Sequence, residues 1–440
     1  MLLNIAVVSG RAITFGALAV TCLSAVVVVL AATKWFASKP RRNTTSAQDD
    51  RKKYALLCAV GLAIFAVSLA MALRAHQRPY GFRGPALADF SSLEPIDAHT
   101  HIFHTGPAFV AMLTRLHMHV LNIMYVDDTD PYRPTTHPQE EDALNFIASS
   151  KGRAKLCTTF DPFRFNDPDF AAPAIRSLNK DFDQGAIAAK IWKNIGMEVK
   201  DKSGRYILPD DPGLEPIYRD IAARDKTLIV HAAEPDAAWE SSRNPANPNA
   251  KYYIDHPQWD MSTKKTAPDK NTILQARDHL LAMNPNLRVI GAHFGSLEDH
   301  LDDLAARLDQ HPNFAVDTAA RMPALVAQPR SRVRDFLLKY QDRILYGTDR
   351  EFYAANKGQT AAELWEAQYA RDWRYLATND KFKYLGHDVQ GLDLPRSVLK
   401  KIYHDNAVHW IPGILGTQQN AASQLNSSTQ RRAFHLRGSS

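Results

Sequence analysis

Two histidines separated by a single residue, His99 and His101, are the first side chains in the sequence with the spacing of a metal site. They close the β-rich segment 96–101, and alternate residues of a strand point to the same face. Both imidazoles therefore face one way, where they can share one metal ion. The pattern alone is weak evidence. A second such pair, His117 and His119, precedes the next expected strand, so we interpret it as structural or surface.

Three further side chains end apolar runs in the same manner, namely His231, His293 and Asp349. Active sites of parallel barrels form at the carboxyl ends of the strands, so we expect these residues to meet His99 and His101 at one mouth. Imidazoles together with a carboxylate suit Zn²⁺ or a similar divalent ion that keeps one position open for water. A single residue of this kind is more often an ordinary core or loop residue. Five of them at the ends of successive expected strands favour a metal site.

The elements that would position these residues are eight short apolar runs that alternate with helix-like stretches from about residue 93 onward. This rhythm predicts βα units and a parallel sheet, and eight strands predict a (β/α)₈ TIM barrel of the α/β class. Runs that are apolar throughout are typical of strands covered on both faces. The expected strands are 95–99, 120–126, 155–160, 186–192, 227–231, 288–293, 314–317 and 343–349.

Two long stretches interrupt this rhythm. The first, 232–271, is rich in Pro, Asn and Trp, and its aromatic residues favour an ordered lid over the site. The second, 351–394, follows the eighth strand and contains a helix-like run, 361–376, that is placed to cap the mouth. We therefore assign 77–416 to the barrel, and the Gln-, Ser- and Asn-rich segment 417–440 to a disordered tail.

Residues 1–76 differ from the rest in composition. The uncharged apolar runs 12–33 and 54–73 are each long enough to span a hydrocarbon layer of roughly 30 Å. The basic loop between them is expected in the cytoplasm. This pattern predicts two transmembrane helices that anchor an extracytoplasmic domain, periplasmic if the source is bacterial. A cleavable signal peptide and a buried apolar hairpin remain open as alternatives.

The formal net charge of +6 comes from this first region, which holds nine Lys and Arg against two acids. The chain from residue 77 onward contains 44 of the 53 basic residues and 45 of the 47 acidic ones, so it is nearly neutral, and its sequence shows no basic stripe. Nucleic-acid binding is therefore not expected. The three cysteines, Cys22, Cys58 and Cys157, give neither a disulfide framework nor a zinc-knuckle spacing. The oligomeric state cannot be predicted from the sequence.

Taken in order, the His-x-His pair, the two later histidines and the aspartate resemble the amidohydrolase superfamily. The segments Ile-Gly-Ala-His-Phe-Gly at 290–295 and Lys-Ile-Tyr-His-Asp-Asn-Ala at 401–407 look most like its amidohydrolase-related branch. That branch includes aminocarboxymuconate-semialdehyde decarboxylase and related hydrolases and hydratases. The resemblance covers about residues 95–412.

The resemblance implies one divalent ion, with Zn²⁺ as the leading candidate, and His293 as an acid/base or substrate-polarising residue. Other members carry a lysine after strand four, which is carboxylated and bridges two metals, and Lys190 stands at nearly that place. A buried lysine must be paired or neutralised. Lys190 is thus either such a bridge or the partner of a carboxylate on the barrel or the substrate. The implied metal ligands are His99, His101, His231 and Asp349.

The leading hypothesis is hydrolysis of an amide, ester or lactone of a small molecule. The metal would lower the pKa of its bound water, Asp349 would orient that water and take its proton, and His293 would stabilise charge on the carbonyl oxygen. One alternative is non-oxidative decarboxylation or hydration on the same ligands. Another is an inactive barrel that serves as a membrane-tethered binding protein. Secondary candidates at the mouth include Asp317, Arg321 and Arg350. Ordinary surface ion pairs would explain the presence of these residues equally well.

Overall fold

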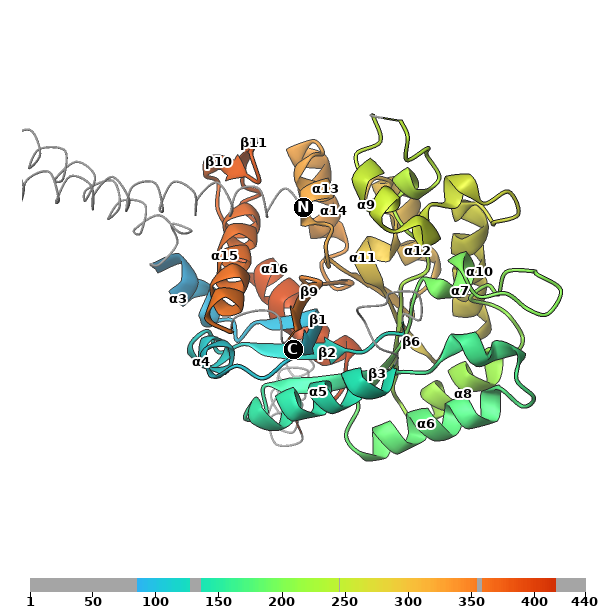
Figure 1. Cartoon of the computed structure of the whole chain (residues 1–440). Coiled ribbons are helices and arrows are strands. Elements are labelled where there is room, and N and C mark those ends of the chain that lie inside the picture. The colour runs from blue at the N-terminus through green and yellow to red at the C-terminus, as the bar shows by residue number, and fades with distance from the viewer. Residues whose placement is uncertain (1–84, 127–135, 245, 354–357, 417–440) are drawn as a thin grey trace, which may run out of the picture. The chain divides into compact units, whose positions relative to one another are not determined.

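The computed structural model describes residues 85–126, 136–244, 246–353 and 358–416, and a single parallel sheet lies at the centre of this part (Figure 1). Its strands follow the order β8-β7-β6-β5-β4-β3-β2-β1-β9. The last strand is divided into β8 (Ile344–Leu345) and β9 (Arg350–Tyr353), and β9 pairs in parallel with β1 (Ile96–Phe103). The sheet therefore curls back on its first strand, which is consistent with the expected TIM barrel.

The strands lie where the apolar runs predict them, because every one of these runs is covered on both faces. Side chains from the strands β1 to β8 meet in one buried cluster, and Trp410 and Ile411 after the last strand pack into it. Only β7 has the bounds expected for it, and the other strands begin or end one to four residues away from expectation. The largest differences are at the ends of the first and eighth strands. β1 continues past His101 to Phe103, and the eighth strand leaves the ladder after Leu345. The others are β2 (His119–Ile123), β3 (Ala154–Thr159), β4 (Ala188–Ile191), β5 (Thr227–Val230), β6 (Arg288–Gly291) and β7 (Phe314–Asp317).

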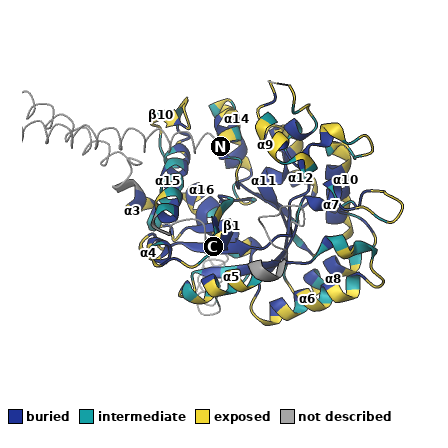
Figure 2. Cartoon of the chain, in the orientation of Figure 1, coloured by how far each residue is buried: buried dark blue, intermediate teal, exposed yellow. Residues whose placement is uncertain are grey.

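The helices around the sheet bury one side and expose the other (Figure 2). In α6 (Ala171–Asp183), for example, Ala174, Leu178 and Phe182 recur every four residues and are buried, which is the spacing of an amphipathic helix. The longer helices of this layer are α4 (Pro107–Arg115), α5 (Thr136–Ser149), α8 (Glu215–Ala223), α10 (Lys270–Met283), α12 (Leu301–Gln310) and α14 (Arg330–Lys339).

Both long stretches contain regular structure. Within 232–271 lie α9 (Ala250–Asp255) and three short 3₁₀ turns, and Tyr253 and Trp259 are buried there. After β9 come α15 (Gly358–Ala377) and the hairpin of β10 (Lys381–Tyr384) and β11 (His387–Gln390). α15 packs against α4 and α3 (Pro85–Ser91), beside β1. The chain then ends its described part with α16 (Arg396–Lys400), a π-turn at Lys401–Asp405 and α17 (Asn406–Trp410).

The structure contradicts the predicted membrane-anchored localisation of the domain. In the described part of the chain, no helix combines the length and the apolar character needed to cross a membrane. The apolar segments 12–33 and 54–73 lie outside the described residues. The predicted anchor, the extracytoplasmic placement and both alternatives depended on these two segments. The polar tail 417–440 also lies outside them, so the boundaries assigned to these regions stay predictions.

Candidate metal centre

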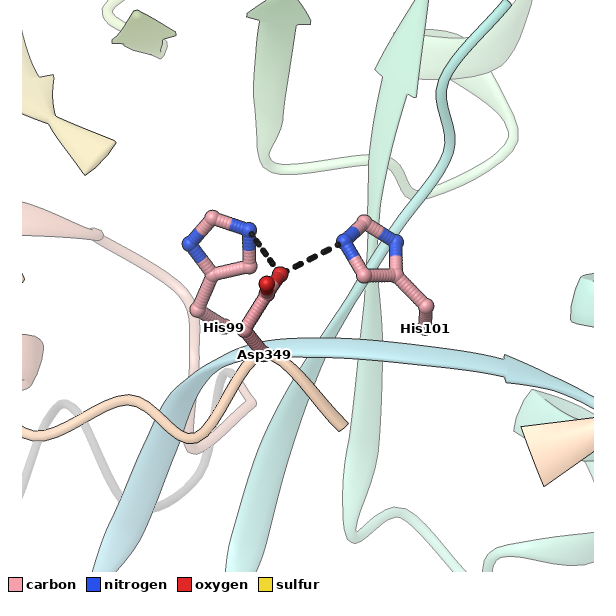
Figure 3. Close-up of side chains that lie close together, drawn as sticks. All are labelled: His99, His101 and Asp349. Atoms are coloured by element: carbon pink, nitrogen blue, oxygen red, sulfur yellow. Dashed lines mark ion pairs between the residues drawn. The ribbon is translucent and has the colours of Figure 1, made fainter. Parts of the chain in front are cut away.

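Three of the residues expected at the mouth come together as His99, His101 and Asp349 (Figure 3). Nε2 of His99 lies 3.4 Å from Oδ1 of Asp349, and Nε2 of His101 lies 3.3 Å from the same oxygen. In a tetrahedral zinc site with bonds of ~2.0–2.2 Å, neighbouring ligand atoms stand ~3.3–3.6 Å apart. Both contacts to Asp349 therefore have the spacing of ligands to one metal ion, and the three ligand atoms lie within 4.8 Å of one another. No other group of this kind occurs among the described residues.

Hydrogen bonds fix both imidazoles in the form that binds a metal. Nδ1 of His101 donates to the carbonyl oxygen of Ile123 at 2.7 Å, and Nδ1 of His99 donates to Oδ2 of Asp317 at 2.7 Å. Each Nε2 is then left as an unprotonated ligand atom. Burial lowers the pKa of His99 well below its usual range, so its imidazole is neutral at pH 7.

The end of β1 is shaped to present these rings. The pairing of β1 with β2 shifts register between Asp97 and Thr100, and such irregularities re-aim side chains. Beyond the shift, the Asn122 side chain bonds both N and O of Ile102, at 2.7 and 2.8 Å, and so holds the end of the strand in place.

Asp349 reaches the pair through an unusual backbone turn between β8 and β9. Its φ is 59°, a left-handed conformation that costs energy in a residue other than glycine. Its N–H donates to the carbonyl of His99 at 2.9 Å. Gly347 makes this approach possible, because a Cβ there would lie 2.9 Å from Cβ of His99. Burial opposes ionisation of Asp349, but the imidazoles of His293 and His101 outweigh it and hold its pKa well below the usual range.

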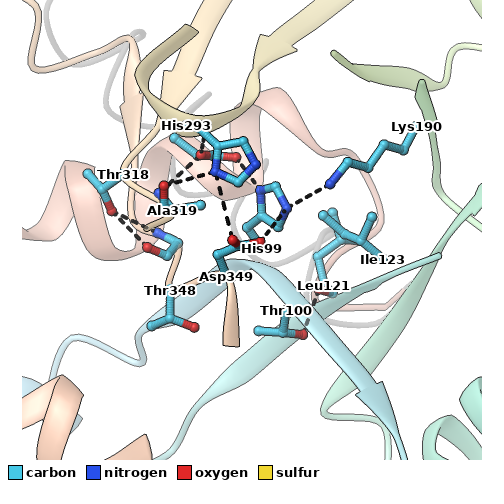
Figure 4. A network of polar contacts seen from close by, with 12 residues as sticks. His99, Thr100, Leu121, Ile123, Lys190, His293, Thr318, Ala319, Thr348 and Asp349 are labelled. Carbon is cyan, nitrogen blue, oxygen red and sulfur yellow. Dashed lines mark hydrogen bonds and ion pairs between the residues drawn. The ribbon is translucent and has the colours of Figure 1, made fainter. Parts of the chain in front are cut away.

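His293 lies next to this group, as expected (Figure 4). Its Nδ1 donates to the carbonyl of Ala319 at 3.0 Å and stands 4.0 Å from Oδ2 of Asp349. Its backbone is left-handed, with φ of 58°, and its N–H donates to Oδ1 of Asp317 at 2.8 Å. Strain of this kind at a turn is typical of functional sites.

His231 follows β5 and packs against His293, with ring centroids 4.1 Å apart. It does not join the group of three ligand atoms. However, it is 5% exposed, and both ring nitrogens are buried without a hydrogen-bond partner among the described residues. Buried polar atoms are almost always paired, so His231 fits a group that a metal or a substrate completes.

Lys190 points into the same centre from β4 (Figure 4). Its side chain is 1% exposed, and Nζ lies 2.9 Å from Nε2 of His99. Burial lowers the pKa of this amine. Because Lys190 contacts the atom of His99 that would bind a metal, it must either move aside or take part in binding.

Residues that sequence reasoning left uncommitted or missed complete the surroundings. Asp317 is buried and bonds His99, whereas Arg350 bonds Gln368 of α15 through Nε at 2.6 Å. Lys193 and Glu234, on the loops after β4 and β5, form a buried ion pair that the sequence reasoning did not identify. Both follow the carboxyl ends of strands, and this position was the signal that could have identified them.

Replacing Asp317 with asparagine should weaken metal binding by about 10- to 100-fold, the usual effect of losing a carboxylate behind a histidine ligand. The amide cannot accept the Nδ1 proton of His99 in the same geometry and still bond the N–H groups of His293 and Ala319. Competition with a chelator measures the affinity. Asp181→Asn is the matched control, since Asp181 is also buried but bonds Thr158, away from the centre. Equal affinity in Asp317→Asn and the wild type would refute the assigned role.

Comparison with known proteins gives one family match. The model of the family described as Amidohydrolase matches residues 96–412. Dihydroorotase from Campylobacter jejuni is 11% identical, covers 72% of this chain and 82% of its own, and has a TM-score of 0.40. A 2,6-dihydroxybenzoate decarboxylase is 14% identical, and the match covers 72% of this chain and 98% of the decarboxylase, with a TM-score of 0.38. The 4-oxalomesaconate hydratase of Rhodopseudomonas palustris is 11% identical, and the match covers 76% of this chain and 99% of the hydratase, with a TM-score of 0.40. A search of curated proteins gives no match.

Proposed function

The chain belongs to the amidohydrolase family, and from that premise we propose that it is a metal-dependent hydrolase that cleaves an amide, ester or lactone bond in a small molecule. The observation that carries this proposal is the convergence of two Nε2 atoms on one oxygen of Asp349, at 3.3 and 3.4 Å. The side chain of Asp349 is 28% exposed, so a substrate can reach it from the mouth.

Zn²⁺ suits the donor set of this centre, because imidazole and carboxylate ligands are those it commonly takes in hydrolases. When bound, such an ion acts as a Lewis acid and brings the pKa of a coordinated water toward neutrality. The ring nitrogens of His231, which have no hydrogen-bond partner in the described part of the chain, support a fourth ligand after β5. A second ion, bridged by carboxylated Lys190, is the variant of this proposal in which the lysine takes part in binding. The residues proposed to hold the first ion are His99, His101, His231 and Asp349.

The proton transfers fall to Asp349 and His293. Asp349 is ionised at pH 7, so it orients the attacking water, accepts its proton and returns it to the leaving group. Nδ1 of His293 donates to the Ala319 carbonyl, which leaves Nε2 as the atom that gains and loses a proton. Burial lowers the pKa of His293 well below its usual range, so the ring takes up a proton from solvent at Nε2 only as negative charge develops beside it. It then donates to the carbonyl oxygen of the substrate, stabilises that charge and returns the proton to solvent when the carbonyl re-forms.

The alternative, non-oxidative decarboxylation or hydration of an acid, draws support from Arg321. This guanidinium follows β7 and pairs through Nε with Oε1 of Glu298 at 2.8 Å. Burial opposes its charge, but Glu298, then Glu234 and then Asp349 outweigh that effect and raise the pKa of Arg321. A charged arginine within electrostatic reach of Asp349 suits a substrate that carries a carboxylate.

The products distinguish the two reactions. The metal-loaded protein is incubated with small esters, lactones and amides while acid release is followed by titration at constant pH, and with aromatic and unsaturated acids while CO₂ and double-bond absorbance are followed. We expect acid release from members of the first panel, absent in Asp349→Asn. CO₂ release or hydration alone would show that the lyase alternative is correct and the hydrolase proposal wrong.

A further inference from the structure

Asp97 is a buried carboxylate on β1 with no role in the proposed chemistry. Its Oδ1 accepts hydrogen bonds from the backbone N–H groups of His99 at 3.2 Å and Thr348 at 3.0 Å. Its Oδ2 accepts from the hydroxyls of Thr348 at 2.7 Å and Tyr369 at 3.0 Å. These four donors match the four lone-pair sites of a carboxylate. Burying such a group is costly, so its contacts show what it holds together.

The two backbone groups bonded to Asp97 belong to the segments that carry the proposed ligands. His99 is itself a proposed ligand, and Thr348 directly precedes Asp349. The N–H of Asp349 also donates to the carbonyl of His99, which joins the two segments a second time. The spacing between the two ligand side chains therefore depends on where the carboxylate of Asp97 holds the two backbones.

The fourth donor to Asp97 comes from outside the βα repeats. Tyr369 lies on α15, in the stretch that follows the last barrel strand, and its side chain is fully buried. Its ring stacks on Phe90 of α3, with centroids 5.8 Å apart and planes at 26°. Packing thus fixes the ring from the side of the helix layer, and its hydroxyl extends inward to Oδ2 of Asp97.

We propose that α15 is part of the apparatus that positions the metal ligands: the Tyr369 hydroxyl orients Asp97, and Asp97 sets the distance between the backbones of His99 and Asp349. This inference rests on the proposed metal-binding role of those two residues. Tyr369 and Asp97 are positioning residues, because neither touches the ion or the substrate. Loss of the hydroxyl leaves one lone pair of Asp97 unfilled and lets the carboxylate rotate away from the two N–H groups.

The test compares Tyr369→Phe with Tyr384→Phe in the full chain. Tyr384 is equally buried, and its hydroxyl donates at 2.6 Å to another buried carboxylate, that of Asp372 on α15. Both substitutions delete one buried hydroxyl bonded to a carboxylate, but only the first removes a hydrogen-bond donor to Asp97. Zn²⁺ affinity is measured by chelator competition, and the urea midpoint of unfolding is measured on the same samples.

We expect similar shifts of the urea midpoint in both variants, with Zn²⁺ bound about tenfold more weakly by Tyr369→Phe alone, in line with other residues behind metal ligands. Thr348→Val, which removes the other hydroxyl donor to Oδ2, should weaken Zn²⁺ binding in the same way. Wild-type affinity in Tyr369→Phe, or equal weakening in Tyr384→Phe, would overturn this inference and leave the proposed metal site intact. A wild-type chain that binds no Zn²⁺ would overturn both.

Discussion

Replacing Asp349 with asparagine should reduce kcat by about a thousandfold while the protein still folds and still binds metal. The amide preserves the shape of the side chain and one oxygen next to His99 and His101, but it cannot accept the proton of the attacking water. General bases contribute roughly 10²–10⁴-fold to enzymatic rates. Steady-state kinetics and metal content, measured on the same preparation, give the result.

The control for this substitution is Asp342→Asn. Asp342 is exposed, forms an ion pair of 2.7 Å with Lys401 and lies away from the mouth. It should leave kcat unchanged. Near wild-type turnover of a metal-loaded Asp349→Asn protein would show that another group takes the proton. The mechanism proposed for Asp349 would then be wrong, even if the metal site were correct.

Removing the metal should abolish turnover, by at least about a thousandfold, since Lewis-acid activation supplies several kcal/mol and each 1.4 kcal/mol is a factor of ten. The chain should stay folded when stripped, because its own contacts already hold the centre together. Lys190 bonds His99, and Asp317 holds the other side of the same ring. Turnover before and after chelation, with circular dichroism as the check on folding, tests both expectations.

Addition of Zn²⁺ to the stripped protein should restore turnover, because the ion needs to displace only the Nζ contact of Lys190 at 2.9 Å. Stripped protein that keeps full activity would contradict the metal-dependent mechanism. Stripped protein that unfolds would contradict the view that the apo centre is held by its own hydrogen bonds.

The strand order and the positions of most site residues were predictable because both depend on local patterns. A strand covered on both faces must be apolar throughout, so eight such runs show where the sheet lies. A residue at the carboxyl end of a parallel strand lies at the mouth, and His231, His293 and Lys190 follow that rule. The shared family motif gave the same set.

Other features depend on contacts between distant parts of the chain, and no local pattern carries them. Asp317 meets His99 across 218 positions and Tyr369 meets Asp97 across 272. α15 contains a second buried tyrosine, Tyr375, and periodicity cannot tell which of the two bonds an aspartate of β1. The left-handed turn at Asp349 divides the eighth strand where apolarity alone predicts continuity.

The localisation prediction had a different weakness, since it relied only on the hydropathy of 12–33 and 54–73 and on the basic loop between them. A run of apolar residues meets the length criterion for a span without any evidence from the fold. It is corrected by the finding on the described helices, and the centre's chemistry does not depend on it.

The most direct test of the central claim is the metal content per chain of the purified protein, measured by elemental analysis beside a His99→Asn/His101→Asn double variant. We predict about one zinc-class ion per wild-type chain and none in the variant. About two ions per chain would assign Lys190 to a bridge between metals. No metal in the wild type, even when Zn²⁺ is supplied during refolding, would contradict the account.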